Sequence, residues 1–244
     1  MITDKERKRY IRQIPMIGEA GQERLKSARV LVAGAGGLGT VISLYLAAAG
    51  VGCLRIVDCD AVEPSNLNRQ ILHWSGDIGR PKTASIEEKL AALNPLIRIE
   101  TVSGRITEES IEKMVRSCDL IVDAMDNFPT RYLLNRTAVA KGIPFIHGAV
   151  RGFFGQATTV IPGKTPCLRC IFPGGISPQE VPIVGATCGV IGSIEATEAI
   201  KLLAGLGEPL SGRLFLWDGL ALSADSVTVE RDPSCPVCGI RKGG

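Results

Sequence analysis

A glycine turn near the start of the chain is the first group of residues whose spacing indicates chemistry. Gly34, Gly36 and Gly39 follow a short apolar run at 28–33 and precede a run of small and helix-forming residues. Between a strand and a helix, the spacing G-x-G-x-x-G lets the backbone approach a phosphate while the helix dipole favours its charge. Asp58 ends the next expected strand, where a carboxylate can accept hydrogen bonds from ribose hydroxyls. The pattern predicts an adenosine nucleotide and leaves NAD and ATP open.

Polar residues in the following loops favour ATP. Asn66, Arg69 and Lys82 lie in or beside loops at the carboxyl ends of the expected strands, the edge at which open α/β sheets bind ligands. Two cations suit a triphosphate whose charge grows at the leaving pyrophosphate, whereas a dinucleotide needs fewer. Asp126 adds a carboxylate of the kind that binds Mg²⁺. Simpler interpretations remain open: Lys82 on a helix surface, a solvated Arg69, and a turn formed by Asp126 and Asn127.

Four of the eight cysteines form two Cys-x-x-Cys pairs, which are Cys167, Cys170, Cys235 and Cys238. Each pair can bind one tetrahedral metal from two sides, and the spacing predicts a structural Zn²⁺ site with no open coordination position. Four unligated thiols are the alternative. Of the other four cysteines, those at 53, 59 and 118 lie in or beside expected strands, where burial as small apolar side chains is the default.

The elements that must position these residues alternate along the first 150 residues. Strands are expected at 28–33, 54–57, 97–102, 120–124 and 144–147, and helices at 40–49, 82–93, 107–116 and 130–140. This alternation predicts an α/β fold with a doubly wound, Rossmann-like, mainly parallel sheet. Strands at 155–161, 213–217 and 226–230 lack that rhythm and predict an antiparallel C-terminal extension, with a long helix at 189–204 between the first and second of them.

We therefore expect one domain over 1–244. It comprises an N-terminal helical arm at 1–28, a nucleotide-binding half at 29–150 and an antiparallel extension with a zinc knuckle at 151–244. A net charge of +3, from 28 basic and 25 acidic residues, indicates neither a nucleic-acid nor a membrane partner. The charged residues at 1–12 do not resemble a secretory signal, and the apolar run at 41–51 is too short to span a bilayer. We expect a cytoplasmic protein with reduced thiols.

The combination of motifs resembles the MoeB/ThiF/HesA family, whose members are relatives of the ubiquitin-activating enzymes. The motifs are Arg12-Gln13, Gly34-x-Gly-Gly-x-Gly39, Asp58-x-Asp60, Ser65-Asn-Leu-x-Arg-Gln70, Lys82, Asp126-Asn127 and the two cysteine pairs, which together cover nearly the whole chain. The resemblance implies Mg-ATP-dependent adenylation of a small β-grasp carrier protein that ends in Gly-Gly, carried out by a homodimer. Molybdopterin, thiamin, cysteine and tRNA thiolation pathways use similar machinery, and the sequence does not choose among them.

The resemblance also assigns roles. Asp58 resembles the family's ribose ligand, Arg69 and Lys82 its phosphate-binding cations, and Asp126 its metal-binding carboxylate. Arg12 resembles the arginine that the family inserts into the neighbouring subunit's ATP site. The candidate nucleotide-binding residues are Gly34, Gly36, Gly37, Gly39, Asp58, Asp60, Asn66, Arg69, Gln70, Lys82, Asp126 and Asn127.

Two other classes of function stay open at this point. An NAD-dependent oxidoreductase would keep the glycine turn and Asp58 but would leave Arg69, Lys82 and Asp126 without a role. A non-catalytic scaffold would bind ATP without exchanging pyrophosphate. Cys188 has a catalytic interpretation, because a thiolate at a helix start has a lowered pKa and could capture an acyl-adenylate. Its glycine-rich neighbours indicate tight packing instead, so we expect no covalent adduct.

Overall fold

One eight-stranded sheet organises the computed structural model, which describes residues 1–175 and 182–239. The strand order is β3-β2-β1-β4-β5-β6-β7-β8. The strands are β1 (Arg29–Ala33), β2 (Cys53–Asp58), β3 (Arg98–Ser103), β4 (Leu120–Asp123), β5 (Phe145–Arg151), β6 (Phe154–Val160), β7 (Arg213–Asp218) and β8 (Ser223–Thr228). β1 to β5 are parallel, whereas β6, β7 and β8 continue the sheet antiparallel. The predicted fold class is confirmed.

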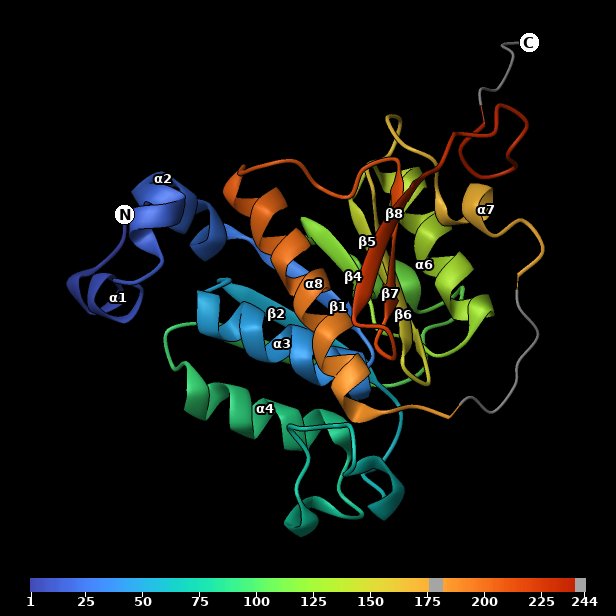
Figure 1. The fold of residues 1–244 in the computed structure, drawn as a ribbon. Helices are drawn as coiled ribbons and strands as arrows, with labels where there is room; N and C mark the ends of the chain where they lie inside the picture. Colours follow the sequence, from blue (N-terminus) through green and yellow to red (C-terminus); the bar gives the residue numbers. More distant parts are fainter. Residues whose placement is uncertain (176–181, 240–244) are drawn as a thin grey trace.

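Helices cover both faces of the parallel half (Figure 1). The helices of the described residues are α1 (Asp4–Arg9), α2 (Ile14–Ser27), α3 (Gly37–Ala49), α4 (Lys82–Leu93), α5 (Ile111–Met114), α6 (Phe128–Lys141), α7 (Leu168–Ile171) and α8 (Gly185–Ala204), with short 3₁₀ turns η1 (Pro64–Asn66) and η2 (Ser75–Asp77). Side chains of α3, α4 and α8 pack on one face of the sheet and those of α5, α6 and α7 on the other, giving two apolar clusters.

The sequence accounts for several element boundaries. The buried Val-Leu-Val run of β1 forms the centre of the parallel sheet, where both faces are covered. α6 begins where the Asn127 side chain accepts the Thr130 amide, and it ends at Gly142, which has a φ of 69°. α4 begins after Pro81 and ends before Asn94, as predicted. None of the described helices is long and apolar enough to cross a membrane.

Three expected elements differ from the structure. α8 begins at Gly185, four residues before its expected start, because the small residues there allow close packing on Arg69 and Gly37. α5 is a single turn at Ile111–Met114, shorter than the expected helix at 107–116. The Ser110 side chain accepts a hydrogen bond from the Thr107 amide just before this turn. β8 starts at Ser223 and pairs its full length with β7, although its side chains are exposed.

Candidate active site

The candidate residues meet where the strand order reverses. β1 pairs with β2 on one side and with β4 on the other. The chain leaves β1 toward β2 and leaves β4 toward β5, so the loops after β1 and β4 diverge. Such a switch point at the carboxyl ends of parallel strands is where open α/β sheets bind ligands. The glycine turn follows β1, and Asp126 follows β4. The glycine turn and Asp126 therefore both follow strands that end at this edge.

Packing requires three glycines of the turn. Gly34 has a φ of 108°, and a Cβ on it would lie 2.7 Å from the Ala124 carbonyl oxygen. A Cβ on Gly39 would lie 1.9 Å from the Gly34 oxygen, and one on Gly37 would lie 2.7 Å from a cysteine sulfur. At Gly36 the nearest atom to a Cβ would be 3.9 Å away. Contacts within the chain therefore do not demand glycine at 36, whereas a closely approaching ligand would.

Asp58 holds the glycine turn from the end of β2. Its Oδ2 accepts the Ala35 amide at 2.7 Å, and its Oδ1 accepts the Asp60 amide at 2.8 Å. The carboxylate is half-buried, so part of it remains open to solvent. The sequence suggested a ribose ligand, and the structure adds a role in fixing the backbone of the turn.

A polar pocket of about 380 Å³ lies beside the turn and contains Lys82. Its lining residues are Cys59, Asp60, Ala61, Glu63, Asn66 and Lys82. Lys82 is only 6% exposed, and its Nζ lies 3.0 Å from Asp60 Oδ2. The hydrogen bond from Lys82 holds the pKa of Asp60 below its usual value. Lys82 is thus not a freely solvated helix-surface residue, which argues against the simpler interpretation.

Asn66, Arg69 and Gln70 lie in or just after the 3₁₀ turn η1, on the connection between β2 and α4. Asn66 Oδ1 accepts the Glu63 amide at 3.1 Å and so caps the 3₁₀ turn η1. Arg69 Nη1 donates to the Ser65 carbonyl at 2.9 Å, while its Cγ lies 3.7 Å from where a Gly37 Cβ would be. Gln70 is buried with its amide facing Gly36, and its Oε1 lacks a hydrogen-bond partner among the described residues.

The loop after β4 presents Asp126 to solvent. Asp126 is exposed and accepts a hydrogen bond from the side-chain amide of Asn127 at 3.2 Å. Asn127 itself caps α6 through Thr130. An exposed carboxylate beside the switch point is available to a cation, whereas Asn127 has a structural role in the chain.

A buried polar cluster beneath this loop was not predicted from the sequence. Asp123 Oδ1 accepts the Met125 amide at 3.0 Å, and Arg131 Nε donates to the Met125 carbonyl at 3.1 Å. His147 Nδ1 lies 2.7 Å from Asp123 Oδ2, and burial lowers the pKa of His147. These contacts fix the peptide immediately before Asp126. The only available signal was a carboxylate at the end of an apolar strand.

Glu195 of α8 completes the buried cluster. Both of its carboxyl oxygens are buried without a partner among the described residues. Burial, together with the nearby Asp123 charge, raises its pKa well above the usual value. The carboxyl group lies against Gly148, where a Cβ would come within 2.3 Å. Burial therefore favours the neutral form of the Glu195 carboxyl group.

Arg12 lies far from the glycine turn of its own chain. The neighbouring Gln13 donates to the Ala49 carbonyl at 2.7 Å, which places this part of the arm at the C-terminal end of α3. The glycine turn is at the other end of that 13-residue helix, about 20 Å away at 1.5 Å per residue. Arg12 is exposed. Arg12 is therefore not part of the site at the glycine turn of its own chain.

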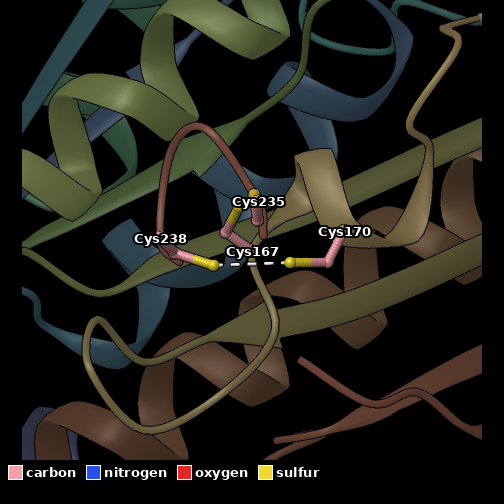
Figure 2. A group of neighbouring side chains, drawn as sticks. All are labelled: Cys167, Cys170, Cys235 and Cys238. Carbon is pink, nitrogen blue, oxygen red and sulfur yellow. Dashed lines mark hydrogen bonds between the residues drawn. The ribbon is translucent and has the colours of Figure 1, made fainter. Parts of the chain in front are cut away.

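The two cysteine pairs converge at one point, as predicted (Figure 2). Cys167 and Cys170 flank the start of α7, and Cys235 and Cys238 belong to the loop after β8. The sulfur atoms are 3.7 Å apart for Cys167 and Cys235 and 3.3 Å apart for Cys170 and Cys238, and all four lie within 4.8 Å of one another. Four thiolates around Zn²⁺ at about 2.3 Å have S···S edges of about 3.8 Å. The donor set fits zinc.

Cys188 does not have the lowered pKa that its expected position suggested. It lies in the fourth position of α8, is 1% exposed, and packs its sulfur against Gly37. Burial raises its pKa to about 11. The correction follows from desolvation, which outweighs the helix dipole at a site with no access to water.

Comparison with known proteins settles the family. The model of the ThiF family matches residues 9–237. The chain belongs to the ThiF family. It is 47% identical to the sulfur carrier protein adenylyltransferase of Thermus thermophilus, with 97% of this chain and 92% of that protein covered. It is 40% identical to the sulfur carrier protein ThiS adenylyltransferase of Escherichia coli, over 98% of this chain and 97% of that protein.

A solved structure of the same fold contains the nucleotide predicted here. The crystal structure of Escherichia coli MccB with ATP matches 95% of this ThiF-family chain and 74% of its own, with a TM-score of 0.84 and 26% identity. The relatives confirm the predicted enzyme class, and this ThiF-family protein is an adenylyltransferase.

Proposed function

We propose that this ThiF-family protein uses Mg-ATP to adenylate the C-terminal Gly-Gly carboxylate of a small ubiquitin-like sulfur-carrier protein, with release of pyrophosphate. The observation that carries the proposal is the meeting of the glycine turn, the Lys82 pocket and Asp126 at the switch point of the sheet. Relatives named for sulfur carrier proteins support the carrier class. An oxidoreductase would leave the pocket cation and Asp126 without a role.

The chemistry requires positioning and charge neutralisation. A carrier's C-terminal carboxylate is ionised at neutral pH, so it can attack the α-phosphate without a general base. Amides of the glycine turn and of the first turn of α3, which have no intrahelical partners, orient the phosphates. Lys82 and Arg69 stabilise the charge that develops on the phosphate oxygens and the leaving pyrophosphate. Asp126 would hold Mg²⁺, which when bound would supply further neutralisation of that charge.

The antiparallel extension offers a surface for the carrier. Phe154, Leu216 and Val227 are exposed, and the strand register places them on the same face of β6, β7 and β8. This is the face opposite α8, since Ile191 of α8 lies against Gly155 on the other side. β5 ends and β6 begins at the carboxyl edge of the parallel strands, so this face adjoins the edge that carries the nucleotide site.

We further infer a homodimer in which Arg12 completes the partner's ATP site. The support is the position of Arg12 at the far end of α3 together with exposed apolar side chains of the same arm, Ile11 and Met16. We also infer a structural Zn²⁺ at the four cysteines, supported by the sulfur spacing.

Carrier-dependent exchange of labelled pyrophosphate into ATP tests the proposal. The assay is run with a panel of purified β-grasp proteins that end in Gly-Gly, and with matched proteins lacking the last two glycines as controls. Exchange that requires both Mg²⁺ and an intact Gly-Gly tail is expected for one or more of the panel. Exchange that occurs equally with the truncated proteins, or ATP binding without exchange by any carrier, would contradict the proposed function.

A further inference from the structure

A buried histidine contacts the backbone of the glycine turn. His73 is 3% exposed and lies on the loop between η1 and η2. Its Nε2 lies 2.9 Å from the Ala35 carbonyl oxygen, and its Nδ1 lies 2.8 Å from Ser85 Oγ. The role of this histidine is not explained by nucleotide contacts, because its side chain points to the protein side of the turn.

The hydrogen bonds around His73 have only one consistent direction. A carbonyl oxygen only accepts, so Nε2 carries the hydrogen that is donated to Ala35. In the neutral ring Nδ1 is then an acceptor, and Ser85 must donate to it. Ser85 Oγ in turn accepts from Lys89 Nζ at 3.0 Å. Burial lowers the pKa of His73, and the nearby Lys82 and Lys89 act in the same direction, whereas the hydrogen bond to Ala35 and the Asp77 charge oppose the shift.

The chain of donors begins at a buried ion pair. Lys89 Nζ lies 2.5 Å from Asp77 Oδ2, and both side chains are almost fully buried. The Lys89 ammonium donates to Asp77, to Ser85 Oγ and to the Ser85 carbonyl, so all of its hydrogens have acceptors. With Lys89 fixed, the direction Lys89 to Ser85 to His73 to Ala35 cannot reverse.

The hydrogen bond between His73 and Ala35 determines which backbone group of the glycine turn points toward a ligand. In a planar trans peptide the carbonyl and the N–H point in opposite directions, and the described chain has no cis peptides. Because the Ala35 carbonyl points inward to His73, the N–H of Gly36 points outward. Gly36 is the glycine whose Cβ position is open. The other side of Ala35 is fixed as well, since its own N–H donates to Asp58.

We propose that His73, as the neutral Nε2–H tautomer, is a positioning residue that orients the Ala35–Gly36 peptide so that the Gly36 N–H binds a phosphate of ATP. The inference rests on the proposed function for the identity of the ligand. The same contact ties the turn to α4, because Ser85 lies one helical turn after Lys82. His73 therefore also fixes the distance between the glycine turn and the pocket lysine.

The tautomer is measured directly by ¹⁵N NMR of the imidazole rings. The chain has two histidines, and His147 donates from Nδ1 to Asp123, so the two rings should show opposite tautomers. We expect one ring with a protonated Nε2 and one with a protonated Nδ1, assigned with His73→Phe. A protonated Nδ1 on His73 in the wild type would overturn the inference.

Binding of Mg-ATP to the full-length protein provides the second measurement. His73→Phe removes both hydrogen bonds and should weaken ATP binding by about tenfold, the factor for one net hydrogen bond. His73→Gln keeps an N–H near the Nε2 position and should recover most of the affinity. In pyrophosphate exchange, the KM for ATP should rise in His73→Phe while the KM for the carrier stays unchanged.

A matched control separates positioning from stability. Thr159→Val, in β6, removes a buried 2.7 Å hydrogen bond to Glu198 of α8, away from the glycine turn. It should lower the melting temperature and leave ATP affinity unchanged. Unchanged ATP affinity in His73→Phe, or equal losses in His73→Phe and Thr159→Val, would overturn the inference.

Two further outcomes are distinguished. If His73→Phe does not fold, the inference is tested with Ser85→Ala and with the ¹⁵N NMR spectrum of the wild type. Ser85→Ala should bind ATP more weakly than wild type, by a smaller factor than expected for His73→Phe. An unchanged ATP affinity in Ser85→Ala would count against the inference. No ATP binding by the wild type would refute the proposed function. Normal wild-type binding with the wrong tautomer would refute the role of His73 alone.

Discussion

Replacement of Lys82 by methionine should remove most of the adenylation activity while leaving the protein folded. The Lys82 side chain is 7% exposed, and its partner Asp60 is 62% exposed. Asp60 would therefore be solvated after the change, and the cost to stability should be small. The effect on catalysis should be large, because a cation about 4 Å from a phosphate oxygen contributes about 4 kcal/mol at an effective dielectric constant of about 20.

Mutagenesis of positioned electrostatic groups gives losses of about 2.7 to 4 kcal/mol, so we expect exchange to fall by roughly 10² to 10³. The measurement is carrier-dependent pyrophosphate exchange at saturating ATP, with melting temperatures recorded in parallel. Lys141→Met is the matched control, since Lys141 also pairs with a carboxylate, that of Glu112, but on the surface near the end of α6. Exchange within threefold of wild type in Lys82→Met, or an equal loss in Lys141→Met, would refute the reasoning.

Four other predictions concern separate features. Asp126→Ala and Arg69→Ala should each lower exchange by about two orders of magnitude or more, and the Asp126 variant should need more Mg²⁺; near-normal exchange would contradict the assignment. Metal analysis should find about one Zn²⁺ per chain, as a four-thiolate site implies, and Cys235→Ser should lower the melting temperature more than it changes the activity of folded molecules; a zinc-free wild type would end that assignment. The raised pKa of Glu195 means that its contribution to wild-type stability is full below the unfolded-state pKa of 4.5 and falls as pH rises toward the folded-state pKa. Relative to wild type, the free energy of unfolding of Glu195→Gln should therefore rise by up to about 1.4 kcal/mol per pH unit between these two pKa values. Urea unfolding curves that show no pH-dependent difference between the two proteins would count against this prediction. Mass spectrometry under non-reducing conditions should show no adduct between chain and carrier, because Cys188 is buried; a thiol-sensitive adduct lost in Cys188→Ala would reverse this.

The parallel part of the fold was predictable because strands and helices alternate regularly along the first 150 residues. Apolar runs that end in glycine or aspartate, such as the one before Gly34, predict buried parallel strands with loops at one edge. The boundaries of α5 and α8 were not predictable, because they depend on contacts with residues distant in sequence. The start of α8 packs on Arg69 and Gly37, more than a hundred residues earlier in the chain.

The site was only partly predictable, for the same reason. Lys82 and Asp60 belong to motifs with recognisable spacing, so their proximity could be anticipated. Glu195 and Arg131 carry no such spacing, and their association with Asp123 arises only when α6 and α8 pack on opposite faces of the sheet. The raised pKa of Cys188 shows the same limit, because helix position is visible in a sequence, whereas desolvation is not.

A metal bound at the four cysteines would also restrict the conformations of the unfolded chain. A metal held there would close a ring, since Cys167 and Cys235 are 68 residues apart. A cross-link over a loop of that length lowers the entropy of the unfolded chain by an amount worth about 4 kcal/mol in the ideal case. The ring contains α8, which packs against α3 and β5. Capture of a metal at one end of the molecule would thus restrain the helix that supports the glycine turn at the other, and a chelator should loosen both together.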